Sequence, residues 1–130
     1  IIPVPDEHVI ESTPTIISWQ TASFVRLLKE AEKEGHVVGI IHNHPAGMDW
    51  FSDQDDANEP DLMQLTANRN GPDARFFSLL LTADGRYAGR VWLAPRPRAY
   101  VGMKSIRVIG DRIRVHYVER GKSSTQPAFA

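Results

Sequence analysis

A short apolar run that ends in two histidines is the feature that most constrains this chain. The run Val37–Ile41 has the length and the β-branched content of a buried strand, and His42-Asn43-His44 follows it directly. Side chains alternate between the two faces of a strand, so His42 and His44 should point the same way. After the loop Ala46–Phe51, the chain can bring Asp55 back to the two histidines as a third ligand. Two imidazoles and one carboxylate suit a zinc ion that keeps a fourth position open for water.

Helical patterns lie on both sides of this strand. Apolar positions at helical spacing predict a helix over Gln20–Glu34, which Gly35 ends. An acidic first turn predicts a second helix over Asp53–Arg69, and we expect Pro60 to break it into two pieces. Residues 1–11 contain prolines within an apolar stretch, which indicates an edge strand or an extended loop.

The second half of the chain has the pattern of strands. One hairpin is predicted from Phe76–Thr82 and Tyr87–Leu93, and another from Ser105–Ile109 and Arg112–Glu119. Between the hairpins, the prolines of Ala94–Tyr100 indicate a connector. This order of helices and strands predicts an α/β fold in which helices sandwich a mixed β-sheet.

Size and composition narrow the functional classes. At 130 residues the chain should form one domain, which we place at 1–120, with a flexible tail or linker at 121–130. The formal net charge is −1, from 15 basic and 16 acidic residues, which argues against nucleic-acid and anionic-membrane partners. Without cysteine, neither a disulfide nor a thiolate metal site can form. No apolar run approaches the ~20 residues of a membrane span, and a cytoplasmic location is the default expectation.

His42, His44, Pro45, Ser52 and Asp55 together resemble the signature of the JAMM/MPN (JAB) zinc metalloproteases. In that signature, His-x-His-Pro is followed by six residues and then by Ser-x-x-Asp, and the spacing here matches throughout. The form Asn-His-Pro-x-Gly is similar to bacterial members of the family, the prokaryotic JAB and RadC-like proteins. The resemblance implies the fold of the family, a mixed sheet with helices in a cytidine-deaminase-like arrangement.

The resemblance covers residues 1–93 and implies an activity. Proteins of this kind are zinc-dependent isopeptidases or peptidases that act on a ubiquitin-like or sulfur-carrier-like protein tail. By this resemblance His42, His44 and Asp55 would hold Zn²⁺. Ser52 would be a catalytic residue that contacts the attacking water or the oxyanion.

The family also uses a glutamate as general base. In the family this glutamate lies on an element that precedes the equivalent of the first five residues. We therefore expect it before Ile1, in an N-terminal element that this chain lacks, so that the fragment would bind zinc without hydrolysing a substrate. Glu7 and Glu11 are the alternatives within the chain.

Other interpretations stay open at this stage. Ser52 is also a good helix N-cap, and Trp50-Phe51 is either part of the core or an exposed lip that grips substrate. The alternative function is a non-catalytic MPN scaffold module, and a RadC-like role near DNA is weakened by the balanced charge. Bacterial JAB domains are often joined to ThiF-type activating-like domains, so we expect such a domain as a partner.

Overall fold

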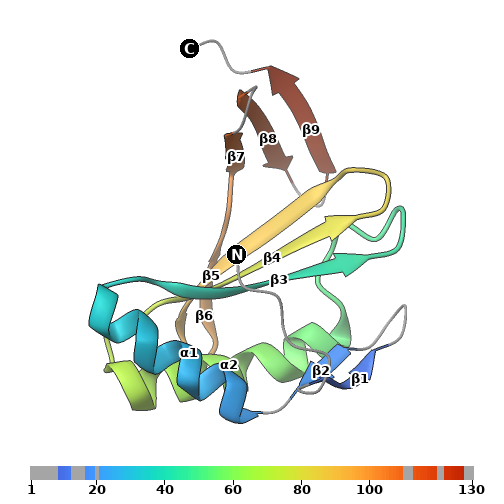
Figure 1. Cartoon of the computed structure of the whole chain (residues 1–130). Helices are drawn as coiled ribbons and strands as arrows, with labels where there is room; N and C mark the ends of the chain where they lie inside the picture. The colour runs from blue at the N-terminus through green and yellow to red at the C-terminus, as the bar shows by residue number, and fades with distance from the viewer. Residues whose placement is uncertain (1–8, 13–16, 20, 110–112, 120–121, 128–130) are drawn as a thin grey trace.

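The computed structural model describes residues 9–12, 17–19, 21–109, 113–119 and 122–127 (Figure 1). The elements, in chain order, are β1 (Val9–Ser12), β2 (Ile17–Trp19), α1 (Thr21–Glu34), β3 (Val38–His44), α2 (Asp53–Asn70), β4 (Phe76–Thr82), β5 (Tyr87–Ala94), β6 (Ala99–Gly102), β7 (Ser105–Ile109), β8 (Ile113–Glu119) and β9 (Lys122–Pro127). No helix in this part of the chain is both long and apolar enough to cross a membrane.

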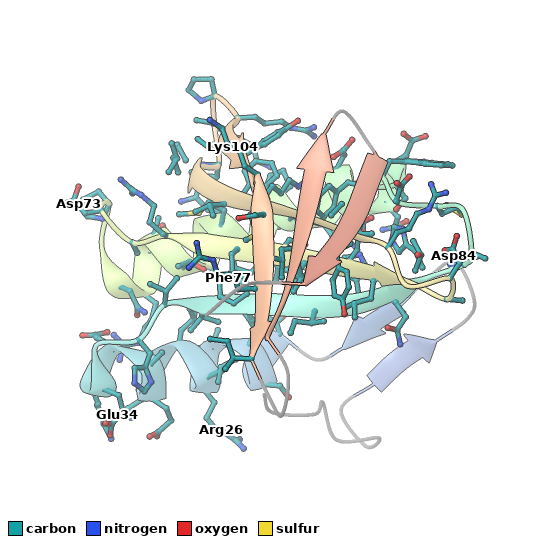
Figure 2. The ribbon with its side chains drawn as sticks, turned by 90° about the horizontal axis from the view of Figure 1, so that it is seen from above. Arg26, Glu34, Asp73, Phe77, Asp84 and Lys104 are labelled. Carbon is teal, nitrogen blue, oxygen red and sulfur yellow. The ribbon has the colours of Figure 1, made fainter. Side chains whose placement is uncertain are left out.

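A four-stranded sheet with the order β3-β4-β5-β6 is the centre of the fold. Strands β3 and β4 are parallel, while β5 and β6 join in antiparallel fashion, so the predicted α/β fold with a mixed sheet is confirmed. Both helices lie on the same face of this sheet, where we expected them on either side (Figure 1). Figure 2 shows the small sheet β7-β8-β9 over the opposite face, on which Phe77 lies.

One apolar core explains why both helices share a face. Phe24 and Leu28 of α1, Met63 of α2, Phe76 of β4 and Trp92 of β5 are all buried in a single cluster. The rings of Phe24 and Phe76 meet edge to face, with centroids 5.8 Å apart. Each helix buries its apolar stripe against the same inward-facing strand positions, which brings α1 and α2 side by side.

Helix α2 is continuous, so the predicted break at Pro60 is wrong. The helix runs over Asp53–Asn70 with Pro60 inside it. Proline lacks the N–H that would reach the carbonyl of Asp56, which weakens a helix interior. Packing outweighs this loss here, because Glu59, Pro60 and Met63 are all buried against the sheet. The helix predicted at Gln20–Glu34 and the strands of the first hairpin are confirmed within one residue at each end.

Strand β6 corrects the prediction of a connector at Ala94–Tyr100. Residues Ala99–Gly102 pair with β5, with a register irregularity between Trp92 and Ala94. Both prolines of the segment precede β6, so they do not remove donors from its ladder. The connector is therefore shorter than the sequence indicated.

Strand β9 corrects the prediction of a flexible tail at 121–130 for residues Lys122–Pro127, while residues 121 and 128–130 lie outside the described part of the chain. Residues Lys122–Pro127 pair with β8 in antiparallel register, while β7 occupies the other side of β8. A ladder is made by backbone groups, so a polar segment can complete it and satisfy an edge that would otherwise stay open. The domain boundary at residue 120 stays a prediction, and residues 1–8 lie outside the described part of the chain.

Candidate metal centre

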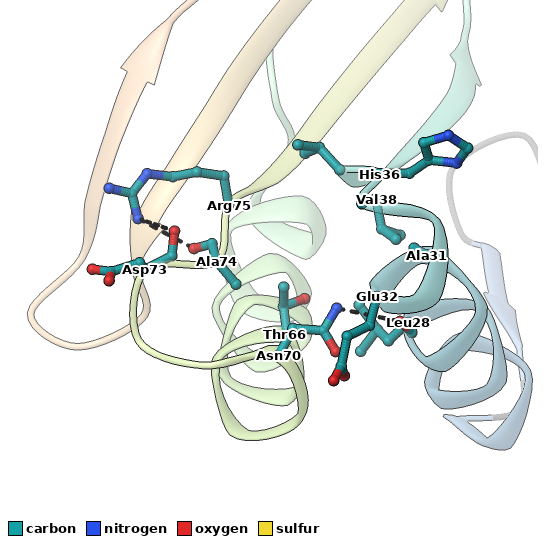
Figure 3. Close-up of a pocket in the computed structure, with 12 residues that line it drawn as sticks. Leu28, Ala31, Glu32, His36, Val38, Thr66, Asn70, Asp73, Ala74 and Arg75 are labelled. Atoms are coloured by element: carbon teal, nitrogen blue, oxygen red, sulfur yellow. Dashed lines mark hydrogen bonds between the residues drawn. The ribbon is translucent and has the colours of Figure 1, made fainter.

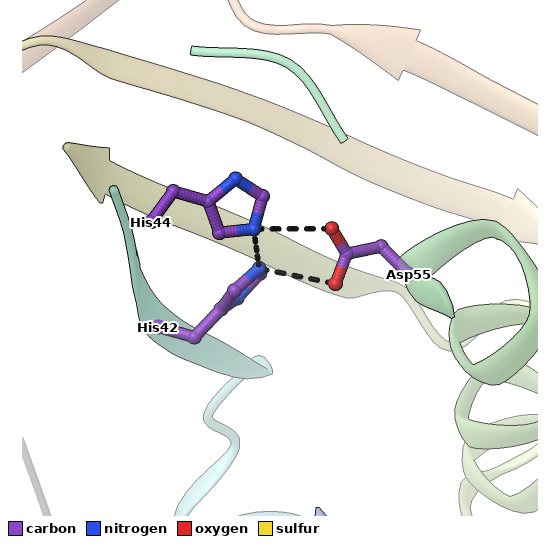
Figure 4. A group of neighbouring side chains, drawn as sticks. All are labelled: His42, His44 and Asp55. Atoms are coloured by element: carbon purple, nitrogen blue, oxygen red, sulfur yellow. Dashed lines mark hydrogen bonds and ion pairs between the residues drawn. The ribbon is translucent and has the colours of Figure 1, made fainter. Parts of the chain in front are cut away.

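Strand β3 delivers both histidines to one face of the sheet. His42 lies opposite Leu80 of β4 in the parallel register, and His44 lies opposite Thr82. Both imidazoles point to the face that carries the helices, where the first turn of α2 brings Asp55 to meet them (Figure 4). The side chains of His42, His44 and Asp55 are 10%, 8% and 15% exposed, so solvent reaches all three.

The three side chains have the spacing of ligands around one ion. Nε2 of His42 lies 3.1 Å from Nε2 of His44. Nε2 of His42 lies 3.2 Å from Oδ1 of Asp55, and Nε2 of His44 lies 3.2 Å from Oδ2. Ligands about 2.0 Å from a tetrahedral zinc are separated by about 3.3 Å. Each of these pairs of nitrogen and oxygen atoms is therefore close to the separation expected around zinc, although Asp55 faces the two histidines with different oxygens, and this group could hold a metal.

A backbone carbonyl sets the tautomer of His44. Nδ1 of His44 lies 3.0 Å from the carbonyl oxygen of Met48, which can only accept. The proton of neutral His44 is therefore on Nδ1, and the lone pair of Nε2 points at His42 and Asp55. Such a bond from the second ring nitrogen is what metal-binding histidines usually make.

Ser52 fixes Asp55, the third candidate ligand, through a capping box. The backbone N–H of Ser52 donates to Oδ2 of Asp55 at 2.7 Å, and its hydroxyl donates to the same oxygen at 2.9 Å. The hydroxyl oxygen in turn accepts from the backbone N–H of Asp55 at 3.2 Å, which makes Ser52 the N-cap of α2. The N-cap interpretation is thus confirmed. The contact with an oxyanion stays a prediction, and the sequence did not indicate that this hydroxyl orients the ligand.

The carboxylate of Asp55 is held in its charged form. Burial would raise its pKa, but hydrogen bonds from His42 and from the backbone and hydroxyl of Ser52, with the charge of His42, lower it to about 2. A metal ligand has to be deprotonated. Protonation of Asp55 therefore does not compete with a cation near neutral pH.

The loop between β3 and α2 is tied to the turn between β4 and β5. Gly47 donates its backbone N–H to Oδ1 of Asp84 at 3.3 Å, and Ala83 donates its own to the carbonyl of His44 at 3.1 Å. Trp50 and Phe51 of this loop, which the sequence predicted as either core residues or an exposed lip, have different surroundings in the structure. Trp50 is 53% exposed, as a lip requires, whereas Phe51 packs on the guanidinium of Arg90.

Arg90 and Glu59 are buried charges near the site that the sequence analysis missed. Arg90 is 3% exposed and Glu59 1% exposed. A signal was present in strand β5, because Arg90 alternates with Ala88 and Trp92 and must share their inward face. The structure does not place the side chain of either predicted alternative for the general base. Among the alternatives, Glu7 lies outside the described residues, and only the backbone of Glu11, in β1, is described.

A separate cavity of about 260 Å³ lies at the opposite end of the helices (Figure 3). It is lined by residues near the ends of α1 and α2, among them Leu28, Glu32, Thr66 and Asn70. Asn70 lies 15 positions after Asp55 on α2, which places this end of the helix roughly 22 Å from the histidines. The side chain of Asn70 donates to the carbonyl of Leu28 at 3.2 Å, which joins the two helices. The cavity is not part of the metal centre.

Comparison with known proteins gives one match. A family model described as prokaryotic homologs of the JAB domain matches residues 2–94. No curated protein and no solved structure matches the chain. The matched residues include β3, the loop after it and α2, so they contain all of His42, His44, Ser52 and Asp55.

Proposed function

Since this chain belongs to the family of prokaryotic JAB-domain homologues, we propose that it is a zinc-dependent peptidase or isopeptidase. The observation that carries the proposal is the meeting of His42, His44 and Asp55: the two Nε2 atoms lie 3.1 Å apart, and each lies 3.2 Å from a different carboxylate oxygen of Asp55. Two imidazoles and one carboxylate make an open, catalytic type of site, whereas structural zinc sites use four protein ligands.

The residues of the chain have separate parts in the proposed reaction. His42 and His44 bind the metal as neutral imidazoles, and Asp55 binds it as a carboxylate. When bound, zinc lowers the pKa of a water molecule toward ~7 and polarises the carbonyl that is attacked. Ser52 keeps Asp55 in place through its backbone N–H and its hydroxyl. To donate to an oxyanion on the substrate, the single hydroxyl proton would have to turn away from Oδ2 of Asp55, which the backbone N–H of Ser52 would still hold.

A ubiquitin-like or sulfur-carrier-like protein tail is the proposed substrate. Such a tail is extended, so it can reach a centre whose ligands are only partly exposed. The exposed ring of Trp50, two residues before Ser52, offers an apolar contact beside the bond that is cut. A ThiF-type activating-like domain is the proposed partner, because bacterial JAB domains are often joined to such domains.

Metal content and cleavage test the proposal together. The full chain should bind one Zn²⁺, measured by elemental analysis, and His44→Ala and Asp55→Ala should lose it. His36→Ala is the matched control, because His36 is an exposed histidine away from the site. Cleavage of a ubiquitin-like fusion should depend on the same two residues. Full zinc content in His44→Ala would overturn the ligand assignment, and zinc binding without cleavage of any such fusion would favour a scaffold module.

A further inference from the structure

A buried guanidinium joins strand β5 to the first turns of α2. Nε of Arg90 donates to Oε1 of Glu59 at 2.9 Å, and Nη1 donates to Oδ1 of Asp56 at 2.8 Å. Asp56 and Glu59 are three residues apart, so they lie on one face of the helix. A rigid guanidinium that reaches two carboxylates on one face restricts both the translation and the rotation of the helix.

Aromatic rings hold the same guanidinium in place. Its central carbon lies 3.9 Å from the ring centroid of Phe51, 5.0 Å from that of Trp92 and 4.9 Å from that of Tyr100. The indole N–H of Trp92 donates to Oε1 of Glu59 at 2.9 Å, so that one oxygen receives two hydrogen bonds. Such contacts between a cation and an aromatic ring become stronger when water is excluded.

The contacts of Arg90 surround Asp55 without touching it. Phe51 precedes the capping serine, Asp56 follows Asp55 directly, and Glu59 lies one turn further along α2. The hydrogen bonds that Asp55 receives from Ser52 come from its own capping turn, so they cannot fix that turn relative to the sheet. The ring of Phe51 also lies 6.4 Å from the ring of His42. Arg90 thus links β5 to the segment that carries Asp55 through Asp56 and Glu59, and Trp92 of the same strand adds a bond to Glu59.

Burial of this cation is costly unless its partners are present. Burial would lower the pKa of Arg90, but the hydrogen bonds and charges of Glu59 and Asp56 raise it, so the side chain stays charged. Replacing buried ion pairs by apolar residues is often neutral for stability, so stability alone does not explain such a cluster. A role in fixing the position of α2 relative to β5 does explain why the chain buries these charges.

We propose that Arg90 is a positioning residue of the metal centre, which holds α2 so that the carboxylate of Asp55 meets the two histidines of β3. This inference rests on the proposed function for the identity of the metal. It gives Arg90 of β5, with Asp56 and Glu59 of α2, a role in the metal centre although none of them would contact the ion.

Zinc affinity in a paired variant tests the proposal. Arg90→Met with Glu59→Gln removes both buried charges at once, and the glutamine oxygen still accepts from Trp92. The affinity for Zn²⁺ alone, measured by competition with a chromophoric chelator, should fall about 10- to 100-fold, the usual loss for residues behind a metal ligand. The visible spectrum of bound Co²⁺ should change as well, because it reports the geometry of the ligands.

The matched control changes the same residue type on the same helix. Arg69 pairs with Glu32 at 2.8 Å, at the far end of α2 and on the surface. Arg69→Met should therefore keep the zinc affinity and the Co²⁺ spectrum of the unchanged protein. A purely structural role for Arg90 would lower the melting temperature without changing either metal readout.

The outcomes separate this proposal from the proposed function. If the unchanged chain binds no zinc, the metal centre is wrong and this inference fails with it. If that chain binds zinc and the folded paired variant binds it within twofold, only the role of Arg90 is overturned. Should the paired variant fail to fold, Arg90→Lys decides, since lysine keeps the charge but cannot form the same planar fork. Zinc affinity and a Co²⁺ spectrum in Arg90→Lys equal to those of the unchanged chain would overturn the proposal, and a loss in both would support it.

Discussion

Removal of the hydroxyl of Ser52 should separate a capping role from a ligand-orienting role. In Ser52→Ala, α2 loses its N-cap acceptor, which typically costs ~1 kcal/mol of unfolding free energy. For a domain of 130 residues this corresponds to roughly 4 °C in melting temperature. Asp55 also loses the hydrogen bond of 2.9 Å to its Oδ2, and bonds to charged groups contribute about 1.5–3 kcal/mol. The backbone bond of 2.7 Å from Ser52 remains, so the ligand is loosened but not released.

Two further variants make the distinction sharp. Glycine at an N-cap costs only a few tenths of a kcal/mol relative to serine, so Ser52→Gly should melt above Ser52→Ala. It still lacks the hydroxyl, so its zinc affinity should fall about tenfold, as in Ser52→Ala. Ser52→Thr restores a hydroxyl and should recover both properties.

The assay combines thermal denaturation of the metal-free protein with zinc competition against a chelator. Cleavage at saturating zinc adds a third measurement, because loss of an oxyanion contact costs ~100-fold or more in rate even when the metal is bound. If Ser52→Gly binds zinc as tightly as the unchanged protein, the hydroxyl does not orient Asp55, and the argument from the bond of 2.9 Å is refuted.

Three other perturbations have expected outcomes. The pKa of Asp55 is lowered from 3.8 to about 2, so its carboxylate should stabilise the metal-free fold above pH ~4 by about 2 kcal/mol and lose this effect as pH falls toward ~2. Asp55→Asn should therefore flatten stability over that range in acid titration followed by circular dichroism, and an unchanged slope would contradict the shift. Chelation of the metal should leave the near-ultraviolet signal intact, because Leu28, Met63 and Trp92 form a core without any ligand; collapse would make the site structural. Trp50→Ala should raise KM for a fused tail about tenfold at unchanged kcat, since the ring is 53% exposed and free to contact substrate; an unchanged KM would leave Trp50 outside the substrate path.

The sequence by itself predicted which three side chains meet at the candidate metal centre, because their placement depends on short-range geometry. The alternation of a strand brings His42 and His44 to one face whatever the rest of the fold does. The spacing of a helix N-terminus brings Ser52 to Asp55, because a capping box needs only the four residues of one turn. The spacing of these residues was also enough to indicate the family, which the match over residues 2–94 confirms.

Only the tertiary structure decided how the ligands are held. The tautomer of His44 follows from a carbonyl that a loop brings to it, and the position of α2 follows from Arg90 and Glu59, which are 31 residues apart. The continuity of α2 through Pro60 also depends on the burial of Pro60 and its neighbours against the sheet, which the local sequence does not predict. A buried charge is tolerated only where its partners meet it, and that meeting is a property of packed elements rather than of neighbouring residues.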